Sequence, residues 1–300
     1  MRVTTNSLIS NLLYDLREAA GRLETSEREL SSLKRINKPS DDPVGTVNAL
    51  RLKATLFDVD RYVANIQDAQ SWLNATEGAL ASLAQVATRA MDIALRAGSG
   101  SLPESSRDAL AREVDQITRE AVDVANQSFG GRSLFAGYST GVRPVTTTEV
   151  NGQVTAVAMH DDSGQMIRQI GPDSTMTINY CVTGVARGAG SSLFDALISL
   201  RQAIDANDRA ALGNAVSVLE DHHSRLVGLE TETGAKDSRL ATTKERLDQM
   251  KLDLIALLSQ VQDTDVAECT VRVQAAQNSY TTALAVGARI IMPTLVDFLK

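Results

Sequence analysis

Both ends of this chain repeat apolar or small residues every three to four positions, which is the spacing of a helix that packs along one narrow face. Near the N-terminus one series stands seven residues apart: Thr5, Leu12, Ala19, Ser26 and Leu33. A second series runs four positions later: Ile9, Leu16, Leu23, Leu30 and Asn37. Because Thr5, Ser26 and Asn37 weaken this face, we expect the helix to need a partner to be stable in water.

The C-terminal part carries the same kind of pattern. Heptads first place apolar residues at Leu240, Leu247, Leu254 and Val261. After Gln262–Asp265, which we call the acidic step, mostly small residues resume the 3–4 spacing: Val266, Cys269, Val273, Ala276, Tyr280, Ala283, Gly287 and Ile290. Small residues let two helices approach closely but bury little apolar area. Pro293 is predicted to end or bend the last helix.

Prolines and glycines divide the chain between these ends. The segment Lys38–Pro43 contains two prolines, so it is predicted to break the first helix, with Asp41 or Asp42 capping the next one. The chain has no proline between Pro43 and Pro103, which permits one long helix with Trp72 at the start of its core stripe. After the turn at 98–101, a helix from about 110 to 124 is predicted to return antiparallel onto it.

The centre of the chain changes character. Residues 138–190 are rich in Thr, Val and Gly, and Asn151-Gly152 is a strong signal for a type I′ hairpin turn. A second turn is expected at 162–165 and a third at Gly171-Pro172-Asp173. The sequence therefore predicts a mainly α protein with a small β insert, folded as an elongated helical hairpin or coiled coil with a central antiparallel β lobe.

Five segments follow from this division. We expect an N-terminal coiled-coil helix over 1–42 and a helical domain whose two parts are 43–137 and 191–262. A β-rich outer domain is expected over 138–190, and a C-terminal coiled-coil helix over 263–300.

Composition excludes several classes of function. A formal net charge of −7 argues against nucleic acid as a partner, since phosphate binding needs clustered Lys and Arg. The N-terminus has no apolar core of a cleaved secretory signal, and no apolar run is long enough to insert into a membrane. Taken alone, composition favours a cytoplasmic helical protein. The two cysteines, Cys181 and Cys269, form neither a disulfide framework nor a metal site.

No pattern of catalytic or cofactor-binding residues stands out. His222 and His223 are adjacent, so they point to different helix faces and are expected to be surface residues. The glycines at 184–190 lack the Gly-Lys-Ser/Thr ending of a phosphate loop. The sequence therefore predicts no enzyme activity, no cofactor and no metal.

Four blocks, taken together, resemble the flagellin family, which includes the flagellins and the hook-associated proteins. They are Arg35-Ile36-Asn37-Lys38-Pro39-Ser40-Asp41-Asp42-Pro43, Glu77-Gly78-Ala79-Leu80, Ala125–Gly137 and Val261-Gln262-Asp263-Thr264-Asp265. In the third block Gly130 stands where flagellins carry the Asn of an Asn-Gly-Arg turn. The first block, the modest insert and the ending Leu295–Leu299 are more similar to the family members at the hook–filament junction.

The resemblance implies an extracellular structural subunit of the bacterial flagellum, exported through the type III apparatus without a cleaved signal. This replaces the cytoplasmic location that composition favours. The implied partners are further copies of the chain in a ring or axial stack, the adjacent hook-associated protein, flagellin and an export chaperone. A filament-forming flagellin is the alternative. An intracellular coiled-coil scaffold is a third reading, but it predicts continuous heptads without a β insert.

Two sets of residues are predicted to carry assembly. The first, the assembly seam, is expected to become firm only when copies pack together; it comprises Ile9, Leu12, Leu16, Leu23, Leu30, Leu33, Val266, Val273, Ala276, Tyr280, Ala283 and Ile290. The second, the joint, is expected to link the terminal coiled coil stiffly to the next helix; it comprises Arg35, Ile36, Asn37, Pro39, Ser40, Asp41, Asp42 and Pro43.

Overall fold

The computed structural model describes residues 5–98, 102–188 and 190–291. Seven helices lie in these ranges, at α1 (Thr5–Ser32), α2 (Pro43–Gly98), α3 (Glu104–Ala125), α4 (Val182–Ala186), α5 (Leu193–Ala206), α6 (Arg209–Gln262) and α7 (Val266–Ile291). Six short strands complete the described part at β1 (Ser128–Phe129), β2 (Arg132–Ser133), β3 (Val145–Val150), β4 (Gln153–Met159), β5 (Ile167–Gly171) and β6 (Ser174–Thr177). The predicted fold class, mainly α with a small β part, is confirmed.

The chain forms two compact units. Unit 1 contains residues 1–58 and 250–300, so that it holds α1, α7, the start of α2 and the end of α6. Unit 2 contains residues 59–249 and therefore all the strands. The predicted bend at Pro293 lies outside the described residues.

Unit 2 is a helical core built around the apolar stripe of α2. Trp72 is 1% exposed, which confirms its predicted place in the core. Two ion pairs, Arg89–Glu120 and Arg96–Glu113, join α2 to α3 with residue numbers that run in opposite directions, so α3 returns antiparallel as predicted. The largest fully buried side chains include Trp72, Phe135, Phe194, Leu73, Leu80, Leu83 and Ile93.

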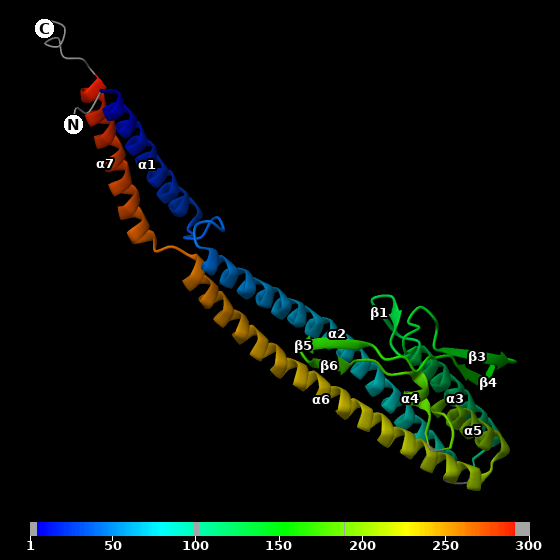
Figure 1. The fold of residues 1–300 in the computed structure, drawn as a ribbon. Coiled ribbons are helices and arrows are strands. Elements are labelled where there is room, and N and C mark those ends of the chain that lie inside the picture. Colours follow the sequence, from blue (N-terminus) through cyan, green and yellow to red (C-terminus); the bar gives the residue numbers. More distant parts are fainter. Residues whose placement is uncertain (1–4, 99–101, 189, 292–300) are drawn as a thin grey trace, which may run out of the picture. The chain divides into compact units, whose positions relative to one another are not determined.

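The β part consists of three separate two-stranded antiparallel sheets, β1–β2, β3–β4 and β5–β6 (Figure 1). In the β3–β4 hairpin, Asn151 and Gly152 have φ of 51° and 77°, as the predicted type I′ turn requires. The turn expected at Gly171–Asp173 joins β5 to β6, whereas 162–165 joins no strand pair. Each hairpin is too small to be stable alone and is held by a helix.

Side-chain hydrogen bonds fix these hairpins to helices. The amide of Asn126, at the end of α3, pairs with both the N–H and the C=O of Val145 on β3. On β5, the Arg168 side chain donates to Asp68 of α2 at 2.8 Å, and Gln169 accepts from Asn65 of α2. The β part therefore lies against α2 and α3 instead of forming one sheet.

Helix α6 places His222 in the core of unit 2, so the expectation of a surface side chain was wrong. His222 is 2% exposed and belongs to a stripe at spacings of three and four whose other members are Leu212, Ala215, Leu219 and Leu226. The imidazole covers Gly188, where an added Cβ would lie 2.8 Å from the ring. Burial lowers the pKa of His222, and the nearby Arg225 cation acts in the same direction, against Asp221, Asp195 and the Ser191 backbone.

This burial predicts an acid sensitivity of unit 2. Because the pKa is lowered in the folded chain, the unfolded chain takes up the proton first, and the free energy of unfolding falls as the pH drops below the ordinary histidine range. We expect urea unfolding, followed by the fluorescence of Trp72, to show less stability at about pH 5 than at about pH 7.

The matched variants are His222→Asn and His223→Asn, since His223 is the half-buried neighbour on another helix face. His222→Asn is expected to reduce the loss of stability between the two pH values, whereas His223→Asn leaves it unchanged. An equal effect of both substitutions on this pH dependence would reject the assignment to His222.

Candidate functional site

The helices α1 and α7 lie side by side and run antiparallel in unit 1 (Figure 1). Leu12 meets Gly287 at one end, where an added Cβ would lie 3.0 Å from Leu12 Cδ2. Near the other end the Cys269 thiol donates to the Ser26 carbonyl at 3.7 Å, which is within range for sulfur. Of the side chains described in these two helices, only Leu12, Ala19 and Cys269 are fully buried. The contact is therefore close but small.

Most side chains of the predicted assembly seam are at least half-buried in these two helices. Leu12 is buried, and a larger group is half-buried: Ile9, Leu16, Leu23, Leu30, Val273, Ala276, Tyr280 and Ala283. Val266 is 49% exposed at the start of α7, and Leu33 is 54% exposed beyond the end of α1. The φ of Leu33 is 57°, a left-handed backbone that ends the helix there. The side chain of Ile290 lies outside the described residues.

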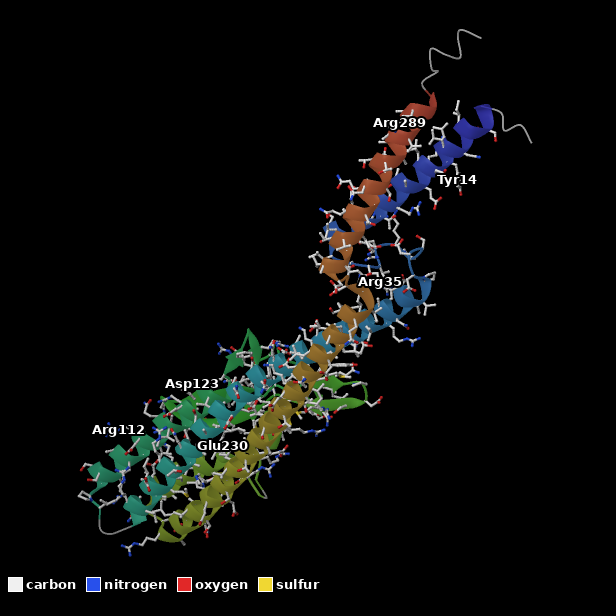
Figure 2. All side chains as sticks on the ribbon, turned by 90° about the vertical axis from the view of Figure 1, so that its left-hand side faces the viewer. Tyr14, Arg35, Arg112, Asp123, Glu230 and Arg289 are labelled. Carbon is white, nitrogen blue, oxygen red and sulfur yellow. The ribbon has the colours of Figure 1, made fainter. Side chains whose placement is uncertain are left out.

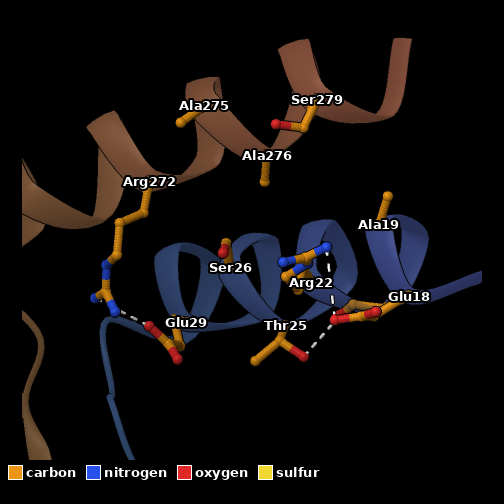
Figure 3. A pocket seen from close by; sticks show the side chains of 11 residues that line it. Glu18, Ala19, Arg22, Thr25, Ser26, Glu29, Arg272, Ala275, Ala276 and Ser279 are labelled. Carbon is orange, nitrogen blue, oxygen red and sulfur yellow. Dashed lines mark hydrogen bonds and ion pairs between the residues drawn. The ribbon is translucent and has the colours of Figure 1, made fainter. Parts of the chain in front are cut away.

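A groove of about 780 Å³ lies between α1 and α7 (Figure 3). Its walls are mostly small side chains: Ala19, Gly21, Thr25, Ser26, Ala275, Ala276 and Ser279. Charged residues accompany them, and Arg272 of α7 forms an ion pair of 3.1 Å with Glu29 of α1. This pair was not predicted, although the opposite charges at the end of α1 and the start of α7 were a usable signal. The groove leaves space that two helices alone do not fill.

The joint between α1 and α2 is a tightly hydrogen-bonded loop. Asp41 accepts from the backbone N–H groups of Asn37 and Lys38, at 3.1 and 2.8 Å. Asp42 accepts from the Gly45 N–H at 2.8 Å, which confirms a capping aspartate at the start of α2, and it pairs with Arg35. These bonds leave the loop little freedom.

The electrostatics of the joint depend on the same two carboxylates. Hydrogen bonding, above all from the Lys38 N–H, lowers the pKa of Asp41. For Asp42 the Gly45 N–H is the largest cause of a lowered pKa, with Arg35 adding to it. Both contributions are present at neutral pH and are lost in acid as the pH falls through the lowered pKa values.

The joint is bound to the acidic step between α6 and α7. The Arg35 N–H donates to the Gln262 carbonyl at 2.8 Å, and the Arg35 guanidinium donates to the Val261 carbonyl at 2.9 Å. The Thr264 N–H donates to the Leu33 carbonyl, and Ile36 beside these bonds is 5% exposed. Figure 2 labels Arg35 at this place. The two helix interruptions of the chain therefore stabilise each other.

The predicted joint residues divide between these roles. Arg35, Asp41 and Asp42 make the bonds, and Ile36 is the buried residue. Pro43 begins α2, and the Asn37 side chain donates to the Lys34 carbonyl at 2.7 Å. The side chains of Pro39 and Ser40 are exposed, as are those of Arg35, Asn37, Asp41 and Pro43. The sequence alone did not indicate that Val261 and Gln262 supply the acceptors.

Unit 1 leaves many large apolar side chains in solvent. The first turns of α2 expose Val44, Val47, Leu50 and Phe57, of which Phe57 is 71% exposed. The last turns of α6 expose Met250, Leu252, Ile255 and Leu257. On α1, Tyr14 is 69% exposed (Figure 2). Such surfaces are typical of proteins that bind other proteins.

The residues that the structure describes contain no group of three or more His, Cys, Asp or Glu side chains placed to hold a metal ion. They also contain no helix with the length and apolar character needed to cross a bilayer.

Comparisons with known proteins agree with this geometry. The family model for the bacterial flagellin N-terminal helical region matches residues 3–140. Polar flagellin F of Vibrio parahaemolyticus is 34% identical over 140 residues, 46% of this chain and 37% of that protein. This chain thus spans little more than a third of that relative. Flagellar hook-associated protein 3 of Salmonella typhimurium is 24% identical over 66% of this chain and 58% of its own length.

A solved structure has the same fold. The flagellar junction protein of Legionella pneumophila superimposes with a TM-score of 0.60 at 14% identity, covering 72% of this chain and all of that one. Residues 3–140 of the chain are therefore similar to the N-terminal helical region of the flagellins, and its fold is similar to that of a flagellar junction protein.

Proposed function

We propose that this chain is a structural subunit of the bacterial flagellum that joins the hook to the flagellin filament. The observation that carries the proposal is the surface of unit 1, where large apolar side chains are exposed and the contact between α1 and α7 is close but small. The flagellin N-terminal region and the fold shared with a junction protein support the same conclusion. The family and the fold belong to structural proteins, and we propose no enzymatic activity.

The proposed mechanism is folding coupled to assembly. An isolated pair of α1 and α7 gains little from burial, because most of its contacting side chains are small or half-buried. Neighbouring copies would fill the groove between the helices and cover the exposed apolar side chains. Many such contacts around an axis add up, while the ordering of each terminus lowers the net gain. In this scheme residues 1–42 and 263–300 are the assembly segments.

The joint would transmit this ordering to the rest of the chain. Asp41 and Asp42 fix the loop, and Arg35 ties it to the acidic step, so the directions of four helix ends are set together. In an assembled tube this arrangement acts as a stiff link from the terminal helices to the start of α2 and the end of α6.

The partners follow from the role. We propose copies of the chain in a ring or axial stack, the adjacent hook-associated protein on one side and flagellin on the other. An export chaperone and the type III export apparatus would bring the chain to its extracellular place without a cleaved signal. Nucleic acid and membrane insertion have no part in the proposal.

A filament-forming flagellin is the second candidate. The 34% identity with polar flagellin F over the N-terminal part favours it. Self-assembly separates the two, because a flagellin is expected to form long filaments from purified protein alone. A junction subunit is expected to stop at a ring or to need a hook end.

Deletion of the gene tests the proposed role. We expect cells without this chain to keep intact hooks, to lack filaments and to release flagellin into the medium. Electron microscopy of the cells and immunoblotting of the medium measure the three effects. Filaments of normal length in the deletion strain would rule out a junction role, and restored filaments upon complementation are the control.

The thiol of Cys269 reports on the order of the termini. Because Cys269 is fully buried between α1 and α7, alkylation requires these helices to separate. In a Cys181→Ser chain we expect fast alkylation of Cys269 in the isolated protein and at least roughly tenfold slower alkylation after assembly, measured by mass spectrometry. The converse chain, Cys269→Ser, leaves Cys181 as the control in unit 2. Equal protection of Cys269 before and after assembly contradicts coupled folding.

The hydrogen bonds of the joint can be removed without changing any residue of the assembly seam. The double substitution Asp41→Ala and Asp42→Ala removes the acceptors for Asn37, Lys38 and Gly45. We expect this chain to be exported and to fold in unit 2, but to restore motility of the deletion strain about tenfold less well. Asp15→Ala is the matched control, since Asp15 is an exposed aspartate of α1. Full motility with the double variant would show that the joint is dispensable.

A further inference from the structure

Two arginines of unit 2 line one open pocket that the terminal helices do not use. Arg132 lies on β2 and Arg168 on β5, and the pocket between them has a volume of about 550 Å³. Tyr138, Thr140 and Gln165 provide its other polar side chains. This volume is in the range of sites for small molecules.

The carboxylate of Asp68 lies within 4 Å of the guanidinium groups of both Arg132 and Arg168. Asp68 Oδ2 accepts from Arg168 Nε at 2.8 Å, whereas Arg132 Nη2 lies 3.9 Å from Asp68 Oδ1, beyond hydrogen-bond distance. Within the described part of the chain, no group accepts a hydrogen bond from Arg132 or from the Nη atoms of Arg168. The pocket therefore carries one uncompensated positive charge and several unused donors.

The Arg132 guanidinium is held in place by the core. Its central carbon lies 5.1 Å from the centre of the Trp72 ring, in a cation–π contact. The Trp72 ring is 1% exposed and is packed edge-on by Phe129, with ring centres 6.3 Å apart. Because the face of the guanidinium is occupied, its edge donors are the groups left for a ligand.

Hydrogen bonds also hold the backbone of the turn that carries Tyr138. Asp162 accepts from the Tyr138 N–H at 2.9 Å, from the Ser139 hydroxyl at 2.7 Å and from the Gly164 N–H at 2.7 Å. These three bonds hold the turn that carries Tyr138, whose own side chain is 70% exposed. The backbone at this edge of the pocket is therefore held in place.

We propose that this pocket binds an acidic sugar, whose carboxylate is held by Arg132 and Arg168 and whose hydroxyl groups meet Tyr138, Thr140 and Gln165. Paired guanidinium groups match the planar, bidentate geometry of a carboxylate. Phenol, hydroxyl and amide groups both donate and accept, as sugar hydroxyls require. The chain as a whole is acidic, with a net charge of −7, so retention of an anion depends on this local geometry.

Titration of the full chain with three probes at constant ionic strength tests whether binding requires both the carboxylate and the sugar hydroxyls. The probes are sodium glucuronate, neutral glucose, and sodium acetate, which has the carboxylate without the sugar. Calorimetry and the fluorescence of Trp72, the only tryptophan, are the readouts. We expect saturable binding of glucuronate and at least roughly tenfold weaker binding of the other two.

Two pocket variants and one control test whether glucuronate binds in this pocket. Arg168→Gln and Tyr138→Ala are each expected to weaken glucuronate binding about tenfold, equivalent to about 1.4 kcal/mol. Arg143→Gln makes the same charge change at an exposed residue outside the pocket and is expected to bind normally. Tyr138→Ala keeps the test valid if Arg168→Gln does not fold.

The proposal is overturned by any of four results. They are no saturation by glucuronate at millimolar concentration, equal binding of glucose, equal binding of acetate, or an equal loss of binding in Arg143→Gln.

Discussion

The contact between α1 and α7 sets the behaviour of the whole chain. It is close, because Leu12 packs onto Gly287 and the Cys269 thiol reaches the Ser26 carbonyl, yet small and half-buried residues make up most of it. By contrast, α3 buries nine residues within 22 positions. Since apolar burial is the main favourable term in folding, the two terminal helices have far less to stabilise them than unit 2. In the proposed mechanism, neighbouring copies of the chain supply the additional burial.

The joint and the acidic step connect the weakly stabilised helix pair to α2 and α6. In the proposed mechanism, the order that α1 and α7 gain on assembly passes through this connection. Hydrogen bonds from Arg35 to the carbonyls of Val261 and Gln262 hold the joint between α1 and α2 against the break between α6 and α7. The aspartates of the joint then fix the start of α2. In unit 2, side-chain hydrogen bonds fasten the hairpins β3–β4 and β5–β6 to helices.

Local signals in the sequence were sufficient to predict a hairpin turn, a capped helix and a core residue. Asn151-Gly152 predicts its hairpin because few other residue pairs adopt two consecutive positive φ values, and Asp42 before Pro43 predicts a capped helix because each residue suits that position. Trp72 follows from helical periodicity. Leu219 and Leu226 flank His222 at spacings of three and four, which was a usable signal that its side chain is buried, but the adjacent histidines suggested a surface pair. The stripe was the stronger signal.

Contacts between residues far apart in the sequence could not be predicted in this way. Nothing near Arg35 indicates that its acceptors lie at Val261 and Gln262, and nothing in β2 or β5 indicates that Arg132 and Arg168 line one pocket. The hairpins β3–β4 and β5–β6 were expected in one lobe over 138–190, and β1–β2 was not expected, because turn signals do not reveal which strands pair. These features depend on the packing of helices against one another, which one sequence without relatives does not specify.

Hydrogen–deuterium exchange of the full chain, isolated and assembled, tests the central claim most directly, because it reports the opening of each helix separately. The account predicts that amides of α1 and α7 exchange quickly in the isolated chain while those of α3 are protected, and that assembly slows α1 and α7 by orders of magnitude. Slow exchange throughout α1 and α7 in the isolated chain, equal to that of α3, would contradict it.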